Sequence, residues 1–439
     1  MDYGKEGGMK ALIFDGSPEG DSTGERVAGV LAELLAVQGY ESEHVVLRKK
    51  TIGNCIGCFG CWLKTPGICV IDDDNRELSR RFIGSDLLIM LTPVTFGSYS
   101  PELKRMLDHF IANVSPFFMT VRGETHHRNR YADYPDLLVI GWLDHRNGVE
   151  EALFRHLAWR NSINFYAQRS SWGIIEPSAA SVTLREQVTG LLQGLDKPSA
   201  LPGENLPDAA ATSAMEVSPR KALLLVGSPR MAHSTSASLG GYLLDRLEAQ
   251  GIETETIHIY KALHDPGKLR QLLDAVDNAD LCILSFPLYI DTIPAPLLSV
   301  LQKIHECRKG KALHGGFVAI ANSGFIESSQ NETALAVCSA FAGASGFRWM
   351  GSITIGGGEG LAHGRPLAEL GGPVIPYKKA FDRVAQSLAA GNPVPEDARR
   401  QLARPFVPAW IYRLVGSMEW KKRARRNGVL HKIDDRPYL

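Results

Sequence analysis

One stretch of the sequence occurs twice, and this repeat limits the possible folds more than any other feature of the chain. Lys10–Thr23 reads KALIFDGSPEGDST, and Lys221–Thr235 reads KALLLVGSPRMAHST. Each copy begins with a nearly all-apolar run, which is typical of a strand buried on both faces of a parallel sheet. Each run stops at Gly-Ser-Pro, a turn signal, and helical patterning follows. The repeat therefore predicts two similar units, each built from a strand, a small-residue loop and a helix.

The loop in each copy has the composition of an anion site. Hydroxyl residues precede the predicted helix: Ser22 and Thr23 in the first copy, and Ser234 and Thr235 in the second. The free backbone N–H groups and the positive end of a helix attract anions, and hydroxyl groups add donors. Neither copy contains GxxxxGK[ST] or GxGxxG, which argues against a nucleotide triphosphatase and a dinucleotide fold. A plain strand–helix turn is the alternative, but two copies in matching contexts favour a phosphate-binding loop.

The order of apolar runs and amphipathic segments predicts the fold class. After each copy of the repeat, short buried strands alternate with segments of helical spacing. This alternation predicts an α/β protein with two tandem doubly wound parallel sheets. Residues 193–219 are rich in Pro, Gly, Ala and Ser without periodicity, and we interpret them as a linker. The predicted domains are residues 1–192 and 220–403, followed by a tail at 404–439.

The sequence also predicts the local structure of two segments in the second half of the chain. The Gly-rich run GGGEG, Gly356–Gly360, is expected to be a loop after the last strand. In the tail, Trp410, Leu414 and Met418 lie on one helical face, and the basic run Lys421–Arg426 follows. A basic amphipathic helix can lie on a membrane, but such helices usually carry a longer apolar face. We therefore expect the tail to dock on its own domain.

Composition argues against several kinds of partner and setting. The chain has 439 residues and a formal net charge of zero, so no global field favours nucleic acid. It has no apolar run long enough to span a bilayer, and no export signal is expected at its start. Seven cysteines in such a chain are expected to remain reduced, which indicates a cytoplasmic setting.

A second pair of loops follows the third strand of each unit. DLLIMLTP, Asp86–Pro93, aligns in register with DLCILSFP, Asp280–Pro287, and the loops PVTFGSYS and PLYIDTIP follow. A third pair of loops follows the fourth strands, at Asp144–Gly148 and Asn322–Phe325. Because the carboxyl ends of parallel strands share one edge of the sheet, we expect the three loops of each unit to meet there.

These loops resemble those of the flavodoxin-like NAD(P)H-dependent FMN reductases and, more narrowly, of the iron–sulfur flavoproteins. The resemblance covers nearly the whole chain, once in each half. In the family the first loop reads roughly G-S-P-R followed by polar residues and Ser/Asn-Thr, and it holds the FMN phosphate. The second half matches it with Gly227, Ser228, Pro229, Arg230, Ser234 and Thr235. The first half matches it with Gly16, Ser17, Pro18, Ser22 and Thr23, but Glu19 stands where Arg is usual and the loop is one residue shorter.

The resemblance also implies which residues hold the isoalloxazine ring. In the family the second loop reads P-V-Y-F-G-S or P-L-Y, and its backbone contacts the ring. The first half matches it with Pro93, Val94, Thr95, Phe96, Gly97 and Ser98. The second half matches it with Pro287, Leu288 and Tyr289, and its third loop adds Asn322, Ser323 and Gly324.

The two halves are expected to differ as flavin sites. Arg230 can pair with the FMN phosphate, whereas the carboxylate of Glu19 opposes it. The first half, however, keeps the fuller ring loop and a cysteine-rich segment. We therefore expect a pocket in both halves, with the first functional and the second competent.

The cysteine-rich segment is the most distinctive local signal. Cys55, Cys58, Cys61 and Cys69 form C-x2-C-x2-C-x7-C, a spacing that lets thiolates converge on one site. The iron–sulfur flavoproteins carry a similar compact motif for a [4Fe–4S] cluster, usually with a shorter last gap. Zinc is one alternative, and a loop that merely closes over the flavin is another, because spacing alone does not fix a metal.

The three remaining cysteines and two polar residues near the end of a predicted helix are expected to have structural roles. The remaining cysteines, Cys282, Cys307 and Cys338, lie in apolar patterns and are expected in the core. Asp108 and His109 end an amphipathic helix and are expected at the surface or at an interface.

The resemblance implies an NAD(P)H-dependent FMN reductase of the quinone-oxidoreductase type. NAD(P)H is expected to give a hydride to N5 of FMN, and the reduced flavin to pass electrons to a quinone, another flavin or an iron–sulfur centre. This hydride step requires no acid–base side chain, so no catalytic residue is assigned. One alternative is an electron-transfer flavoprotein without NAD(P)H oxidation, and another is a flavin-free scaffold role for one half. A small-molecule acceptor is the expected partner, with a redox protein and a second copy of the chain as further candidates.

Overall fold

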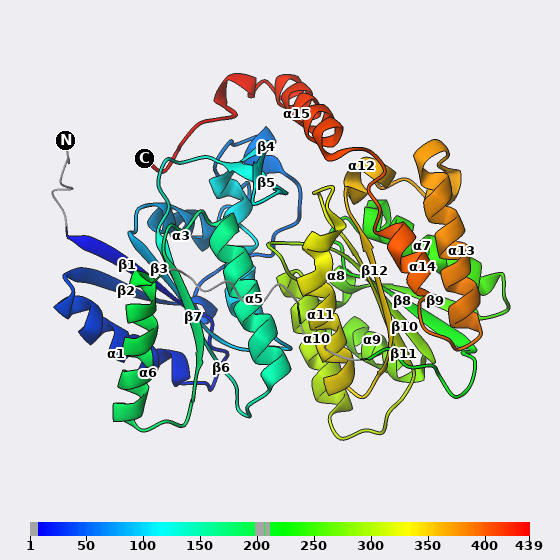
Figure 1. The fold of residues 1–439 in the computed structure, drawn as a ribbon, viewed down its shortest axis with the longest axis horizontal. Coiled ribbons are helices and arrows are strands. Elements are labelled where there is room, and N and C mark those ends of the chain that lie inside the picture. The colour runs from blue at the N-terminus through cyan, green and yellow to red at the C-terminus, as the bar shows by residue number, and fades with distance from the viewer. Residues whose placement is uncertain (1–7, 198–205, 207–210) are drawn as a thin grey trace. The chain divides into compact units, whose positions relative to one another are not determined.

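The computed structural model describes residues 8–197, 206 and 211–439, so the expected linker at 193–219 lies partly outside the described residues. The chain divides into two compact units. The first unit contains the described residues of Met1–Met119, His126–Asn205 and Gly416–Leu439, and the second contains those of Thr120–Thr125 and Leu206–Val415. Each unit is a sheet with helices on its faces (Figure 1).

The first unit contains a five-stranded parallel sheet in the order β2-β1-β3-β6-β7. Its strands are β1 (Met9–Asp15), β2 (Tyr40–Val46), β3 (Leu87–Pro93), β6 (Asp136–Trp142) and β7 (Ser170–Ile175). Its longer helices are α1 (Thr23–Val37), α3 (Asp74–Ile83), α4 (Pro101–Leu107), α5 (Gly148–Asn164) and α6 (Ser181–Gln193). The alternation predicted from the sequence is confirmed in this unit.

The core of the first unit forms because alternate residues of the strands point to the same face of the sheet. Ile13 of β1 and Ile89 of β3 join one buried cluster with Leu31 of α1 and Val188 of α6. Helices α1 and α6 therefore cover the same face. Fully burying an aliphatic side chain of this size contributes about 1.5–3 kcal/mol, so the apolar runs are the main source of the sheet's stability.

The second unit repeats the same topology, with the order β12-β11-β10-β8-β9 and parallel pairing throughout. Its strands are β8 (Lys221–Val226), β9 (Glu253–His258), β10 (Leu281–Pro287), β11 (Gly316–Asn322) and β12 (Arg348–Ile355). Its helices are α7 (Thr235–Glu248), α8 (Ile259–Ala262), α9 (Pro266–Asn278), α10 (Ala295–Arg308), α11 (Glu332–Ala344), α12 (Gly358–Ala362), α13 (Ile375–Ala389) and α14 (Glu396–Leu402).

Two local elements differ from what the sequence predicts. The run GGGEG is not simply a loop, because the short helix α12 begins inside it, just after Gly357 with its φ of 65°. A hairpin of β4 (Val114–Val121) and β5 (Glu124–Asn129) also follows α4. Its turn residues Arg122 and Gly123 both have positive φ, which suits a tight two-residue hairpin, but Arg-Gly is not a strong turn signal.

The expectation that the tail docks on its own domain is wrong for its later part. Helix α15 (Ala409–Arg426) begins in the second unit, and everything from Gly416 onward belongs to the first unit. There Trp420 packs edge-on against Trp62, with 5.1 Å between ring centroids, and against Phe59 of the cysteine loop. Among the described residues, no helix is both long and apolar enough to cross a membrane.

A buried arginine fixes the last residues of the chain in the first unit. The Nη1 atom of Arg130 donates to the carbonyl oxygen of Ile433 at 3.0 Å and to that of Asp435 at 2.7 Å. Its Nε atom donates to the carbonyl oxygen of Ala112 at 3.1 Å. Hydrogen bonds to a charged group are stronger than neutral ones, so Arg130 ties the end of the tail to the segment that precedes β4.

We expect Trp420→Ala to lower the free energy of unfolding of the first unit by about 2 kcal/mol, because it removes a half-buried indole from the cluster around Trp62. Urea unfolding followed by circular dichroism measures the loss. Trp410→Ala is the matched control, since Trp410 lies on the same helix but is 63% exposed. An equal effect of the two substitutions would contradict the described docking of the tail.

Candidate functional site

The first two predicted loops of the first unit meet the end of β6, where the third loop begins, at the carboxyl edge of the sheet. The Ser100 hydroxyl donates to the carbonyl oxygen of Gly16 at 2.6 Å, which joins the second loop to the first. The Val94 N–H donates to the carbonyl oxygen of Trp142 at 2.8 Å, which joins the second loop to the end of β6. The Trp142 indole donates to Asp21 at 2.9 Å and closes the ring of contacts. The juxtaposition expected from parallel strands is therefore present.

The first loop of this unit is organised around a buried carboxylate that sequence reasoning did not single out. Asp15 is fully buried, accepts from the Ser17 N–H at 2.8 Å and lies 3.1 Å from Nε2 of His44. Burial acts to raise the pKa of Asp15, but the hydrogen bonds with His44 and Ser17 outweigh it and hold that pKa below its ordinary value. Gly24 allows this arrangement, because a Cβ there would lie 2.2 Å from the Asp15 carboxylate.

The helix that follows this loop keeps an accessible amino end. Ser22 occupies the N-cap position of α1 but makes no capping hydrogen bond with its side chain. Asp21 instead accepts from the Thr23 N–H at 2.8 Å. The amino end of α1 therefore retains donor capacity for an anion, as the sequence predicts, although two aspartates stand beside it.

Arg48 supplies the positive charge that the first loop lacks in the sequence. Its Nη1 atom donates to the carbonyl oxygen of Ser17 at 3.3 Å, and its Nη2 atom donates to Glu25 at 3.2 Å. The side chain comes from the short 3-10 turn Leu47–Lys49 that follows β2, about thirty residues after the loop. A sequence search within the loop finds Glu19 and misses this cation, because only the pairing of β2 with β1 brings Arg48 to the site.

The second loop of the first unit is a tight turn at positive φ. Thr95 and Ser98 exchange backbone hydrogen bonds of 2.8 Å, and Phe96 and Gly97 have φ values of 53° and 81°. Glycine is required at the second position, because a Cβ at Gly97 would lie 2.6 Å from the Cβ of Leu153. Such a turn presents its backbone to the sheet edge, which is the property expected of a ring-binding loop.

Glu150 is a further residue at this turn that the sequence did not indicate. Its Oε2 atom accepts from the Gly97 N–H at 3.2 Å, and its Oε1 atom accepts from Asn147 at 2.9 Å. Burial raises the pKa of the Glu150 carboxyl, although the hydrogen bonds from Gly97 and Asn147 act in the opposite direction. A partly buried acid therefore lies directly beside the predicted ring site.

The first loop of the second unit is organised differently. Ser234 caps α7 by accepting from the Ala237 N–H at 3.0 Å, and its hydroxyl donates to the carbonyl oxygen of Met231 at 2.6 Å. Arg230 forms a two-pronged ion pair with Glu359 of α12, at 2.9 and 2.6 Å. The arginine predicted to bind a phosphate is thus already paired with a carboxylate of its own unit.

The remaining loops of the second unit are brought together as predicted. The Leu288 N–H donates to the carbonyl oxygen of Asn322 at 2.8 Å, and the Asn322 amide donates to Ser236 at 3.0 Å. Tyr289 and Thr292 form the turn that corresponds to Thr95 and Ser98. Other predicted residues, Ser228, Thr235 and Ser323, are buried at the same edge.

The four cysteines of the first unit lie close together in one loop without forming a ready ligand set. Cys61 is buried, Cys55 and Cys69 are half-buried and Cys58 is exposed. Burial raises the pKa of Cys55 to about 12, and the neighbouring Cys69 and Cys58 add to the increase. The Gly60 N–H donates to Cys58 Sγ at 3.4 Å. Among the described residues, however, no three Cys, His, Asp or Glu side chains stand in metal-binding geometry.

His109 lies beneath this cysteine loop, which corrects the expectation that it lies at the surface or at an interface. It is 1% exposed, with Nδ1 3.4 Å from Cys69 Sγ and Nε2 2.8 Å from the carbonyl oxygen of Gly53. Asp108 is also buried and pairs with Lys104. The cysteine loop covers the end of α4, so residues that read as an exposed helix end become interior. Of the other cysteines, Cys282 and Cys338 are buried as expected, but Cys307 is exposed.

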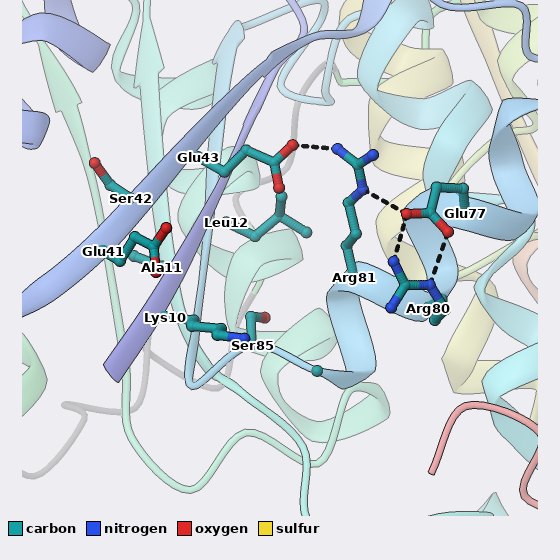
Figure 2. A pocket seen from close by; sticks show the side chains of 11 residues that line it. Lys10, Ala11, Leu12, Glu41, Ser42, Glu43, Glu77, Arg80, Arg81 and Ser85 are labelled. Atoms are coloured by element: carbon teal, nitrogen blue, oxygen red, sulfur yellow. Dashed lines mark hydrogen bonds and ion pairs between the residues drawn. The ribbon is translucent and has the colours of Figure 1, made fainter. Parts of the chain in front are cut away.

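A cavity of about 520 Å³ lies elsewhere in the first unit, beside the first halves of β1 and β2 and the end of α3 (Figure 2). Glu77 bridges Arg80 and Arg81 there, and Arg81 also pairs with Glu43. The hydrogen bond from Arg80 lowers the pKa of Glu77 to about 2. Both arginines already have carboxylate partners, and the predicted loops follow the opposite ends of the strands, so this cavity is not the candidate site.

The strand order and the loop positions together define the class of protein. Counted along the five main strands, each unit has the order 2-1-3-4-5 with three loops at the carboxyl edge, which is the flavodoxin-like arrangement. The sequence profile of the family described as NADPH-dependent FMN reductase matches residues 9–172 and 220–361. The chain belongs to this family and contains its fold twice in tandem.

Individual relatives resemble only parts of the chain. An iron-sulfur flavoprotein of Methanosarcina thermophila is 29% identical over 103 residues, which are 24% of this chain and 53% of that protein. An FMN-dependent NADPH-azoreductase of Staphylococcus aureus is 35% identical over 101 residues, 23% of this chain and 52% of that protein. The chain thus spans about half the length of these curated relatives. The solved NAD(P)H:quinone oxidoreductase from Methanothermobacter marburgensis aligns with 43% of this chain and 97% of its own, at 15% identity and a TM-score of 0.33.

We expect Arg48→Gln to weaken FMN binding about tenfold, because it removes the cation beside the first loop that can pair with a phosphate. Fluorescence titration of the flavin-depleted protein with FMN measures the dissociation constant. Lys49→Gln is the matched control, since Lys49 is 66% exposed and reaches only Glu25, at 3.9 Å. Equal affinities in the Arg48→Gln and Lys49→Gln proteins would show that Arg48 does not contact the phosphate.

Proposed function

We propose that the chain is an NAD(P)H-dependent FMN oxidoreductase that uses the first unit as its flavin site. The observation that carries the proposal is the joining of the first loop, the second loop and the end of β6 at the carboxyl edge of the first sheet, through Ser100, Val94 and Trp142. Membership in the NADPH-dependent FMN reductase family supports it. The relatives named for flavin, azo and quinone chemistry are consistent with a small-molecule electron acceptor.

The residues of the first unit fit FMN in three respects. The amino end of α1 is not capped by Ser22, and Arg48 adds a positive charge at the same loop. The turn at Phe96 and Gly97 offers backbone where a side chain would not fit. These residues would hold and position FMN, which would supply the chemistry of hydride uptake from NAD(P)H and onward electron transfer.

The acceptor and the setting of the protein are further parts of this proposal. We propose a quinone or a second flavin as the acceptor of electrons from reduced FMN. The hydride transfer to FMN itself needs no acid–base side chain. Free cysteines, both buried and exposed, suit a reducing cytoplasm. A redox protein partner and a homo-oligomer remain predictions, as does the alternative of an electron-transfer module that does not oxidise NAD(P)H.

We expect Gly97→Val to lower FMN affinity at least about tenfold and to abolish NAD(P)H oxidation, because the side chain would collide with Leu153 and displace the turn. FMN content and steady-state NAD(P)H consumption with a quinone acceptor measure the two effects. Gly39→Val is the matched control, since Gly39 has a φ of 82° but follows α1 at the other end of the sheet. A flavin-loaded wild-type protein that consumes no NAD(P)H would favour the electron-transfer module instead.

We also propose that the cysteine loop of the first unit binds an iron–sulfur cluster. The C-x2-C-x2-C-x7-C spacing supports the proposal. The thiols of Cys55 and Cys61 lie near enough to their neighbours to raise one another's pKa, although a raised pKa favours the protonated thiol over the thiolate ligand. The described loop does not hold the four thiols as ligands, so it would have to close further around a cluster. For that reason no electron-transfer step is derived through it, and zinc or a metal-free loop stays an alternative.

We expect anaerobically purified protein to contain about four irons per chain, and Cys58→Ser to remove them without unfolding the protein. Iron and sulfide analysis, together with absorbance beyond the flavin bands, measures the cluster. Cys307→Ser is the matched control, because Cys307 is also exposed but lies in the second unit. Wild-type protein that remains iron-free after anaerobic reconstitution would rule the cluster out, and tightly bound zinc would support the zinc alternative.

A further inference from the structure

We propose that Glu359 and Tyr412 close the flavin site of the second unit, so that each chain binds FMN in the first unit alone. The inference rests on the proposed flavin function. It differs from the expectation drawn from the sequence, in which Arg230 makes the second unit competent. Glu359 pairs with the arginine that an FMN phosphate would otherwise bind, and Tyr412 hydrogen-bonds to the loop that the flavin ring would otherwise contact.

The carboxylate of Glu359 takes the place of a phosphate at Arg230. Both nitrogens at the end of the guanidinium contact it, at 2.9 and 2.6 Å, and the Thr235 hydroxyl lies 3.5 Å from Oε2. Bidentate pairing of arginine with a carboxylate uses the same fork of donors that binds a phosphate. An FMN phosphate at this loop would have to displace Glu359 or face its negative charge at short range.

The backbone holds α12 firmly against the loop that contains Arg230. A Cβ at Gly364 would lie 2.4 Å from the carbonyl oxygen of His233, and a Cβ at Gly358 would lie 2.9 Å from the Cβ of Asn322. Such contacts allow only glycine, so the segment after β12 sits directly on the first and third loops. Glu359 is therefore present at a very high effective concentration, which strengthens its competition with a free ligand.

An aromatic residue covers the third loop of the same unit. The Tyr412 hydroxyl donates to the carbonyl oxygen of Gly324 at 2.7 Å. A Cβ at Gly360 would lie 3.0 Å from the Tyr412 ring, and one at Gly357 would lie 2.8 Å from Phe406. The ring of Tyr412 thus packs between α12 and a loop that the family uses for the flavin.

The first unit has no carboxylate at the position that corresponds to Glu359. Counted from the glycine of the first loop, Glu19 takes the position of Arg230. Counted from the last strand, Ala179 follows Ile175 as Glu359 follows Ile355. The carbonyl oxygen of Ala179 accepts from Arg26 at 2.8 Å, and no carboxylate is supplied from this position. Closure is therefore a property of the second unit and not of the fold.

The experiment counts FMN per chain by absorbance after release from the purified protein. We expect one FMN in the wild-type protein and none in Gly97→Val, which blocks the first unit. In the Gly97→Val background, Glu359→Ala combined with Tyr412→Ala should restore one FMN. Glu359→Gln alone, which keeps the shape and removes the charge, should bind FMN at least about tenfold more tightly than the Gly97→Val parent. Glu369→Ala is the control, because Glu369 is an exposed glutamate of the same segment.

Each result supports or overturns the closure. Two FMN in the wild-type protein, or one retained in Gly97→Val, would show that the second unit is open. No FMN in the opened Gly97→Val protein, with circular dichroism unchanged, would show that Glu359 and Tyr412 are not what excludes it. A wild-type protein without FMN would refute the proposed flavin function, whereas restored binding in the Glu359→Ala, Tyr412→Ala protein would still support the closure.

Discussion

Parallel pairing is the constraint on which the rest of each unit depends. Because all five strands of a sheet run the same way, the loops after the first, third and fourth strands end at one edge. Short hydrogen bonds then fix them there, such as Ser100 to Gly16 in the first unit and Leu288 to Asn322 in the second. The apolar runs that form the strands therefore also determine where ligand-binding residues gather.

The two units share this framework but differ in the charges that stand at its edge. In the first unit, the carboxylate of Asp15 is hydrogen-bonded with His44, and Arg48 approaches the loop from the turn after β2. In the second unit, Arg230 is neutralised by Glu359, which arrives from α12. In each unit, a residue outside the first loop thus changes the charge at that loop: Arg48 adds a positive charge in the first unit, and Glu359 pairs with the positive charge of Arg230 in the second. A tandem repeat of one fold can in this way hold one open and one closed site.

The cysteine loop and the tail show a similar dependence on distant residues. Trp62, inside the cysteine motif, packs against Trp420 of α15, and Arg130 holds the backbone at Ile433 and Asp435. Burial of apolar and aromatic area makes the loop part of a compact cluster rather than an exposed flap. His109 becomes interior for the same reason, since the loop covers it.

The sequence alone predicts the strands of the two parallel sheets, their alternation with helices, the tandem order and the three loops of each unit, but not the hairpin of β4 and β5. These features follow from local periodicity and turn residues, which act over a few positions of the chain. Three features become visible only in the folded chain: Arg48 lies beside the first loop, Glu359 pairs with Arg230, and the residues from Gly416 onward belong to the first unit. Each of these contacts joins residues far apart in sequence, and long-range pairing of charged or aromatic side chains leaves no periodic signal.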